Sequence, residues 1–157
     1  MNKKQLIKKH CEERSIYEEQ ARTIIDKWVT TYYPTKKPTI TFTTEEWNHT
    51  DFYFNGKSPS ELKIRWIQDM TQYNKYKEQG FVLSTKKLDY NDYFFYYIPL
   101  TKEMMYITKT QILNGLDNGY ITTTTKNVNK YQFATELGKK QEELLLIPYD
   151  CFTIYPL

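Results

Sequence analysis

The sequence predicts an α/β fold in which one central mixed β-sheet carries helices on its faces. Three observations favour it: an apolar stripe at helical spacing near the N-terminus, several short segments of alternating apolar and polar residues, and the lack of a repeat or linker. A chain of 157 residues can bury most of its unfolded surface in one domain. We therefore expect a single domain over residues 1–157.

Composition limits the classes of function without selecting one. The net charge of +3 permits an anionic partner but does not require one. Cys11 and Cys151 lack metal-ligand spacing and partners, which argues against structural zinc or a disulfide framework. The longest apolar run, residues 93–100, is too short to cross a bilayer. We expect a soluble protein in the cytoplasm of a bacterial or infected host cell, with no membrane association.

The first element is a helix over residues 12–33. Its apolar residues, such as Ala21, Ile25 and Trp28, recur at steps of three and four, and Pro34 ends the pattern. Glu18 borders the apolar stripe instead of pointing straight into solvent.

Three strands follow, over residues 38–44, 50–54 and 60–66. Asn55-Gly56 separates the second from the third, and this dipeptide favours a tight hairpin because both positions of a type I′ turn need positive φ. The remaining segments are predicted from the same patterns. They are a loop or short helix at 67–79, an extended then helical segment at 80–90, strands at 93–98 and 104–108 and a short helix at 110–116. Further strands at 120–125 and 142–155 are expected on or beside the sheet.

The third strand carries charges on one face. Alternation assigns Glu61, Lys63 and Arg65 to one side of the sheet and apolar residues to the other. This pattern is typical of any half-buried antiparallel strand with one solvated face, so a solvated face is the first interpretation.

The hairpin register offers a second interpretation. A two-residue loop sets Asp51 opposite Ser60, and a bulge at Pro59 would move Asp51 opposite Glu61. Facing Cβ atoms are about 5 Å apart, and two carboxylates at that distance repel unless a cation lies between them. Mg²⁺ or Mn²⁺ suits such oxygen ligands, and Lys63 on the same face would meet a water or phosphate oxygen bound there.

These residues resemble the signature of the PD-(D/E)xK nuclease superfamily, an acid on one hairpin strand and (D/E)xK on the next. Asp51 matches the first acid, and Glu61-Leu62-Lys63 matches the triplet. The resemblance covers residues 12–112 and implies a restriction-endonuclease-like αβββαβ core with extra C-terminal strands. Thr50 stands where the motif has proline, which weakens it slightly.

The resemblance implies a magnesium- or manganese-dependent DNA endo- or exonuclease, encoded by a phage or mobile element. Asp51, Glu61 and the Leu62 backbone carbonyl would hold the ion, with Glu18 as a further candidate from the first helix. Lys63 would orient the attacking water or stabilise the phosphoryl oxygens. The residues expected to hold the DNA backbone are Arg65, Lys86 and Lys87, with His49 as a neighbour of the site.

Two alternatives stay open. The chain could be a catalytically silent nuclease-like protein that binds a host protein or nucleic acid, for example as an anti-defence factor. It could also bind nucleic acid without catalysis. A domain this small leaves little room for a recognition module, so we expect a homodimer or a protein partner to supply specificity.

Overall fold

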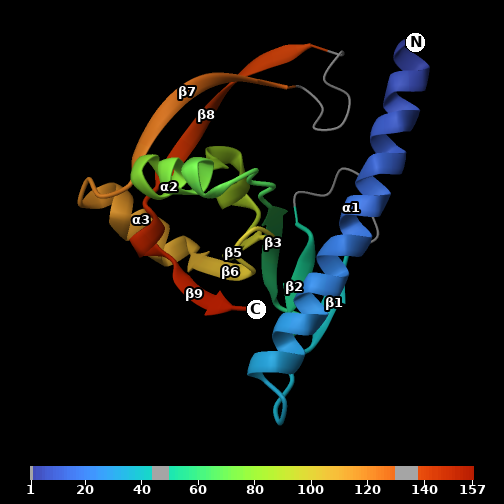
Figure 1. The fold of residues 1–157 in the computed structure, drawn as a ribbon, viewed down its shortest axis with the longest axis vertical. Coiled ribbons are helices and arrows are strands. Elements are labelled where there is room, and N and C mark those ends of the chain that lie inside the picture. The colour runs from blue at the N-terminus through green and yellow to red at the C-terminus, as the bar shows by residue number, and fades with distance from the viewer. Residues whose placement is uncertain (1, 44–49, 130–137) are drawn as a thin grey trace.

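The computed structural model of the chain describes residues 2–43, 50–129 and 138–157. These residues form a mixed α/β structure with two β-sheets and three α-helices (Figure 1). The expected α/β class with a mixed sheet and helices is therefore confirmed. The C-terminal strands were expected on or beside the central sheet, and the structure divides them, with the strands at residues 122–129 and 139–147 in a second sheet and the last strand in the central one.

The N-terminal helix α1 (Lys3–Tyr32) begins well before residue 12, where the apolar stripe first becomes regular. A capping box starts it: the Asn2 side chain accepts from the Gln5 amide and the Gln5 side chain accepts from the Asn2 amide, both at 2.9 Å. These bonds satisfy backbone donors that a helix start leaves unpaired, so the basic N-terminal segment is helical without an apolar stripe. The N-terminal half of α1 extends beyond the six-stranded sheet (Figure 1).

The larger sheet has six strands in the order β1-β2-β3-β5-β6-β9. Their bounds are β1 (Ile40–Phe42), β2 (Phe52–Phe54), β3 (Ser58–Ile64), β5 (Tyr93–Ile98), β6 (Glu103–Thr108) and β9 (Thr153–Pro156). Neighbours pair antiparallel except β3 and β5, which are parallel. A parallel pair needs a crossover connection, and here it contains α2 (Met70–Gln79), β4 (Phe81–Ser84) and the 3₁₀ helix η1 (Thr85–Asp89).

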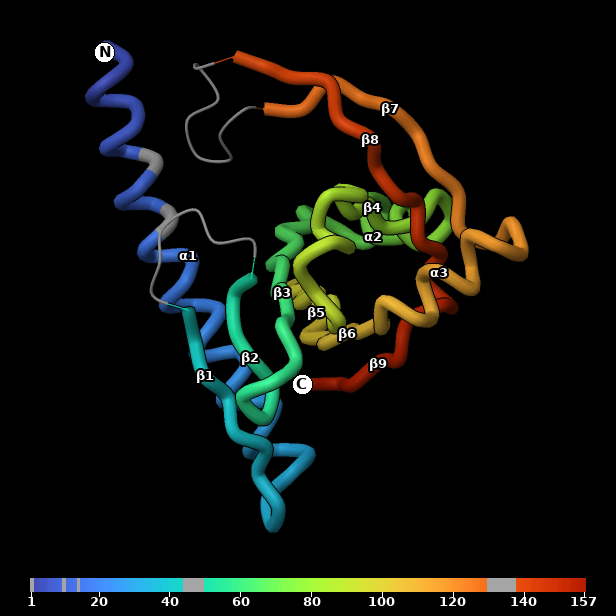
Figure 2. Tube along the Cα trace, turned by 180° about the vertical axis from the view of Figure 1, so that it is seen from behind, coloured from blue at the N-terminus to red at the C-terminus, as the bar shows by residue number. Residues whose placement is uncertain are grey.

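The smaller sheet has the order β4-β8-β7 and is antiparallel, with β7 (Thr122–Asn129) and β8 (Lys139–Ile147) as its long strands. Figure 2 shows these two strands curving away from α3 (Lys109–Asp117) as a long arm. A second 3₁₀ helix, η3 (Tyr149–Cys151), connects β8 to β9.

Segment 67–79, expected as a loop or short helix, contains α2. Asp69 caps its start by accepting from the Gln72 amide at 2.9 Å, and Gly80 ends it with φ 97°. This φ lies in the left-handed region that glycine adopts without strain. Among the described residues, no helix combines the length and apolar character needed to cross a bilayer.

The two faces of the larger sheet bury separate hydrophobic cores. On one face, Ile25 and Trp28 of α1 pack against Leu62 of β3 and Phe95 of β5. The opposite face belongs to the second core, which the smaller sheet, α2 and α3 cover. Its largest buried members include Phe81, Phe94, Tyr96, Ile112 and Leu145.

Candidate active site

The turn at Asn55-Gly56 determines which residues of β2 and β3 face each other. Asn55 and Gly56 have φ values of 53° and 69°, and the Lys57 amide donates to the Phe54 carbonyl at 3.2 Å. Phe54 then pairs with Ser58, so Lys57 is the extra residue in the loop. The predicted bulge at Pro59 is wrong, because Pro59 pairs with Tyr53 in regular register and the shift occurs at the turn.

This register brings Asp51 beside Glu61. Regular pairing ends with Phe52 opposite Ser60, one residue short of Asp51 and Glu61, and the charge of Glu61 acts on the Asp51 carboxyl group. The Asp51 amide also donates to the Ser60 carbonyl at 2.9 Å, which holds Asp51 against β3.

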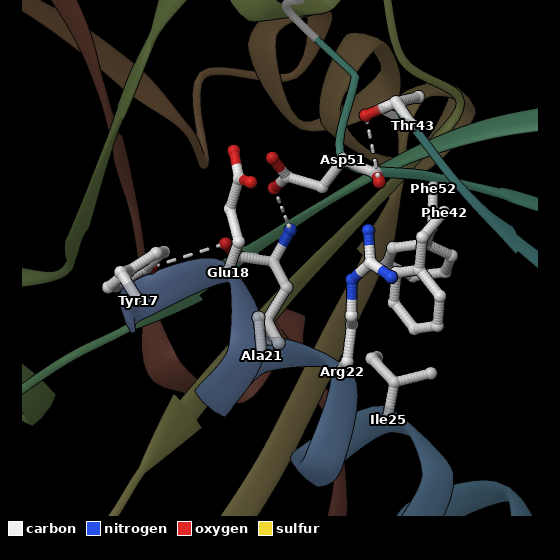
Figure 3. Close-up of a pocket in the computed structure, with 10 residues that line it drawn as sticks. Tyr17, Glu18, Ala21, Arg22, Ile25, Phe42, Thr43, Asp51 and Phe52 are labelled. Carbon is white, nitrogen blue, oxygen red and sulfur yellow. Dashed lines mark hydrogen bonds between the residues drawn. The ribbon is translucent and has the colours of Figure 1, made fainter. Parts of the chain in front are cut away.

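Beyond Ser60, the edge of β3 lacks a pairing partner from β2, and two side chains bond to it instead. The Leu62 amide donates to Oδ2 of Asp51 at 2.8 Å. The Tyr17 hydroxyl accepts from the Ile64 amide at 2.7 Å and donates to the Leu62 carbonyl at 3.3 Å (Figure 3). The carbonyl expected to bind a metal ion is therefore already hydrogen-bonded to α1.

The charged face of β3 is largely covered by protein. Glu61 and Lys63 pair with Phe94 and Tyr96 of β5, so they lie on the side of the second core. Glu61 keeps only 6% of its surface exposed, and Lys63 is half-buried. The interpretation of a solvated strand face is thus wrong for Glu61.

Glu61 has one engaged and one unengaged carboxylate oxygen. Lys87 Nζ lies 3.1 Å from Oε1. Oε2 is buried and has no hydrogen-bond partner among the described residues. A buried carboxylate oxygen without a donor is costly, and a cation at this point would satisfy it.

Burial and the nearby charge of Glu61 affect the protonation of Asp51. Burial, and then the charge of Glu61, raise the pKa of Asp51 from 3.8 to about 7, although the Leu62 amide, Lys87 and Lys63 act in the opposite direction. Burial lowers the pKa of Lys63, while Glu61 opposes this change. Two acids whose ionised forms repel are a donor set that a divalent cation would stabilise.

Glu18 lies half-buried on α1 and lines a pocket together with Asp51. In Figure 3 both carboxyl groups point to the same side of that pocket. Arg22, one helical turn further along, lines it as well, and its guanidinium carbon lies 4.9 Å from the centre of the Phe42 ring. Sequence analysis missed Arg22, although its spacing from Glu18 puts both on one helix face.

The three residues expected to hold the nucleic-acid backbone are placed differently. Arg65 donates to the Val82 carbonyl at 3.0 Å and lies over the Tyr96 ring, so it joins the two sheets. Lys87 pairs with Glu61, whereas the Lys86 side chain is exposed. Of the three, only Lys86 has an exposed side chain, and it forms no ion pair or hydrogen bond with the residues that the structure describes.

The donor set for a metal ion is small. Among the residues that the structure describes, no three His, Cys, Asp or Glu side chains gather to hold an ion. Asp51 and Glu61 are neighbouring carboxylates, Asp51 in the pocket beside α1 and Glu61 on the side of the second core, and His49 lies outside the described residues. Comparison of the chain with protein-family models, curated proteins and solved structures found no match.

Proposed function

We propose that the chain is a metal-dependent DNA nuclease of the PD-(D/E)xK type that hydrolyses phosphodiester bonds. The observation that carries the proposal is the proximity of Asp51, at the open edge of β3, to Glu61, which is buried and whose Oε2 is unpartnered among the described residues. Lys63 lies on the same face, two residues after Glu61. Two acids and a lysine in this arrangement suit Mg²⁺ or Mn²⁺ and a phosphate group.

The order of elements supports the same proposal. The chain runs from a helix through a three-strand meander and a helical crossover to a strand parallel to β3. This is the αβββαβ order that the sequence motif implies, with β4 and η1 added to the crossover. Asp51 follows the end of the pairing between β2 and β3 and lines a pocket beside α1, which a ligand could enter.

In this proposal, Asp51 and Glu61 hold the ion, and the Leu62 carbonyl joins them only if Tyr17 releases it. A bound divalent ion would supply an activated water and neutralise charge on the phosphate. Lys63 would donate to that water or to a phosphoryl oxygen. Arg22 and Lys86 would contact backbone phosphates, which position a nucleic acid without reading its sequence.

The direct test is incubation of supercoiled and linear DNA with the protein in Mg²⁺, in Mn²⁺ and in EDTA. Asp51→Asn and Lys63→Met remove the two charges while preserving side-chain size. Asp89→Asn and Lys86→Met make the same substitutions at exposed positions. We expect metal-dependent cleavage that both site variants abolish, that Asp89→Asn retains and that Lys86→Met at most weakens. Folded wild-type protein that binds no Mn²⁺ and cleaves neither substrate in either metal would refute the proposal.

One observation favours the alternative of a catalytically silent binding protein. Lys87 already neutralises Glu61, and Tyr17 already bonds the Leu62 carbonyl, so the site has internal partners for two of its ligands. A silent protein would fold normally, bind no Mn²⁺ and leave DNA intact. Metal titration of the wild-type protein separates this case from an active enzyme whose preferred substrate was absent.

A further inference from the structure

Lys87 and Glu61 form an ion pair between η1 and β3, two segments that are distant in the sequence. The ammonium nitrogen of Lys87 lies 3.1 Å from Oε1 of Glu61. With only 6% of its surface exposed, Glu61 would be unstable as an anion without a nearby cation. Lys87 therefore supplies the positive charge that makes burial of an ionised Glu61 tolerable.

The ion pair with Lys87 engages only one carboxylate oxygen of Glu61. Oε2 is buried and has no hydrogen-bond partner among the described residues. A carboxylate can accept hydrogen bonds or metal bonds on both oxygens. The single ion pair thus does not exhaust the capacity of Glu61 for a cation.

The Lys87 side chain can leave without a change in the backbone. Its carbonyl accepts from the backbone amide of Asn91 at 3.2 Å and from the Asn91 side chain at 3.1 Å, which fixes the main chain. By contrast, 24% of the Lys87 side chain is exposed. Rotation about the bonds of this flexible side chain would carry the ammonium group into water, where it is well solvated.

We propose that the Lys87 ammonium occupies the cation position beside Glu61 and that a divalent ion binds there only by displacing it into solvent. The inference rests on the proposed metal-dependent function and identifies Lys87 as the group that competes with the ion for Glu61. Removal of the Lys87 charge is then expected to strengthen ion binding, because repulsion between like charges is lost. If Lys87 instead served to orient Glu61 for the ion, its removal would weaken binding.

The first test is titration of the protein with Mn²⁺ alone at pH 8, with free Mn²⁺ measured by electron paramagnetic resonance. We expect Lys87→Met to bind Mn²⁺ at least tenfold more tightly than wild type. Lys75→Met, at an exposed position of α2, is expected to bind as wild type does, and Asp51→Asn much more weakly. Equal or weaker binding by Lys87→Met would overturn the inference.

The second test uses wild-type protein, so it does not depend on the folding of a variant with an unpaired Glu61. Lysines are acetylated with an amine-reactive ester, and the modified peptides are quantified by mass spectrometry. Lys86 is the internal reference for Lys87 within one peptide. We expect saturating Mn²⁺ to raise the ratio of Lys87 to Lys86 labelling at least threefold.

The outcomes separate this inference from the proposed function. Mn²⁺ binding by wild type with an unchanged labelling ratio would overturn displacement of Lys87 and leave the proposed function standing. If neither wild type nor Lys87→Met binds Mn²⁺, both the displacement of Lys87 and the proposed metal-dependent function are overturned.

Discussion

The backbone amide of Leu62 donates a hydrogen bond to the carboxylate of Asp51 at 2.8 Å. This bond joins the residue before β2 to the unpaired edge of β3, next to Glu61. It makes Asp51 a structural residue of the strand edge as well as a candidate metal ligand. A substitution that tests the charge must therefore preserve the acceptor oxygen, which Asp51→Asn does.

We expect Asp51→Asn to stabilise the protein at alkaline pH in the absence of divalent ions. Burial and Glu61 raise the pKa of Asp51 from 3.8 to about 7. Between these values the folded state binds a proton that the unfolded state has lost, so this group's contribution to stability falls as pH rises. The amide introduced by Asp51→Asn does not titrate, and the gain in unfolding free energy should reach about 1–3 kcal/mol at pH 8.

Urea denaturation between pH 4 and pH 8 in EDTA measures this difference. Asp89→Asn, at an exposed position in η1, is the matched control and should track wild type at every pH. A difference between Asp51→Asn and wild type that stays constant across the series would contradict an elevated Asp51 pKa.

We expect Tyr17→Phe to destabilise the protein by about 1–3 kcal/mol, because it leaves the Ile64 amide without its acceptor. Burial raises the pKa of Tyr17 well above its usual value, so its hydroxyl stays protonated and can also donate to Leu62. Tyr120→Phe is the control, since its hydroxyl bonds Asp150 at a position that is 54% exposed. Equal unfolding free energies for the two variants would argue against a structural role for the Tyr17 hydroxyl.

The local patterns of the sequence predicted most elements of the fold but not how distant segments meet. The Asn55-Gly56 turn and the strands at 93–98 and 104–108 follow from residue types within a few positions. The smaller sheet depends on β4 pairing with β8, about 60 residues later in the chain. Alternation indicates that both segments are strands, but it contains no information about which sheet each one joins.

In the candidate site too, the sequence predicted the local arrangement but not the contacts between distant segments. Alternation along β3 places Glu61 and Lys63 on one face, and a single extra residue in the turn brings Asp51 near Glu61. The contacts of Lys87 and Tyr17 with this group come from segments 26 and 45 residues away from their partners, Glu61 and Leu62. They result from packing of η1 and α1 on the sheet, which no local pattern encodes.

A second pH dependence is expected at Glu103, which accepts hydrogen bonds from the hydroxyls of Tyr73 at 2.6 Å and Tyr149 at 2.5 Å. Burial alone would raise the pKa of Glu103, but the hydrogen bonds from the two tyrosines, with the charge of Lys77, lower it below 4.5. A folded pKa below the unfolded value means that stability is present above pH 4.5 and is lost as pH falls.

We therefore expect Glu103→Gln to lower stability at pH 7 by less than about 1 kcal/mol, since solvent screens a half-buried group. The difference should shrink as pH falls from 7 to 3, because the wild-type carboxylate becomes protonated below its lowered pKa. Thermal denaturation at both pH values measures it. Glu78→Gln, on the exposed surface of α2, is the control, and a Glu103→Gln effect that persists undiminished at pH 3 would contradict the role of the charge.

Gly115 on α3 is expected to tolerate no side chain while Ile121 is present. A Cβ at this position would lie 2.5 Å from Cδ1 of Ile121, and the Ile121 amide donates to the Gly115 carbonyl at 2.9 Å. Gly115→Ala gains about 1 kcal/mol of helix propensity but overpacks a buried contact, so we expect a net loss of about 1 kcal/mol. In an Ile121→Ala background the clashing atoms are gone, and the same substitution should become stabilising. Chemical denaturation of the four proteins measures this reversal of sign, and a Gly115→Ala effect equal in both backgrounds would show that Ile121 does not restrict the site.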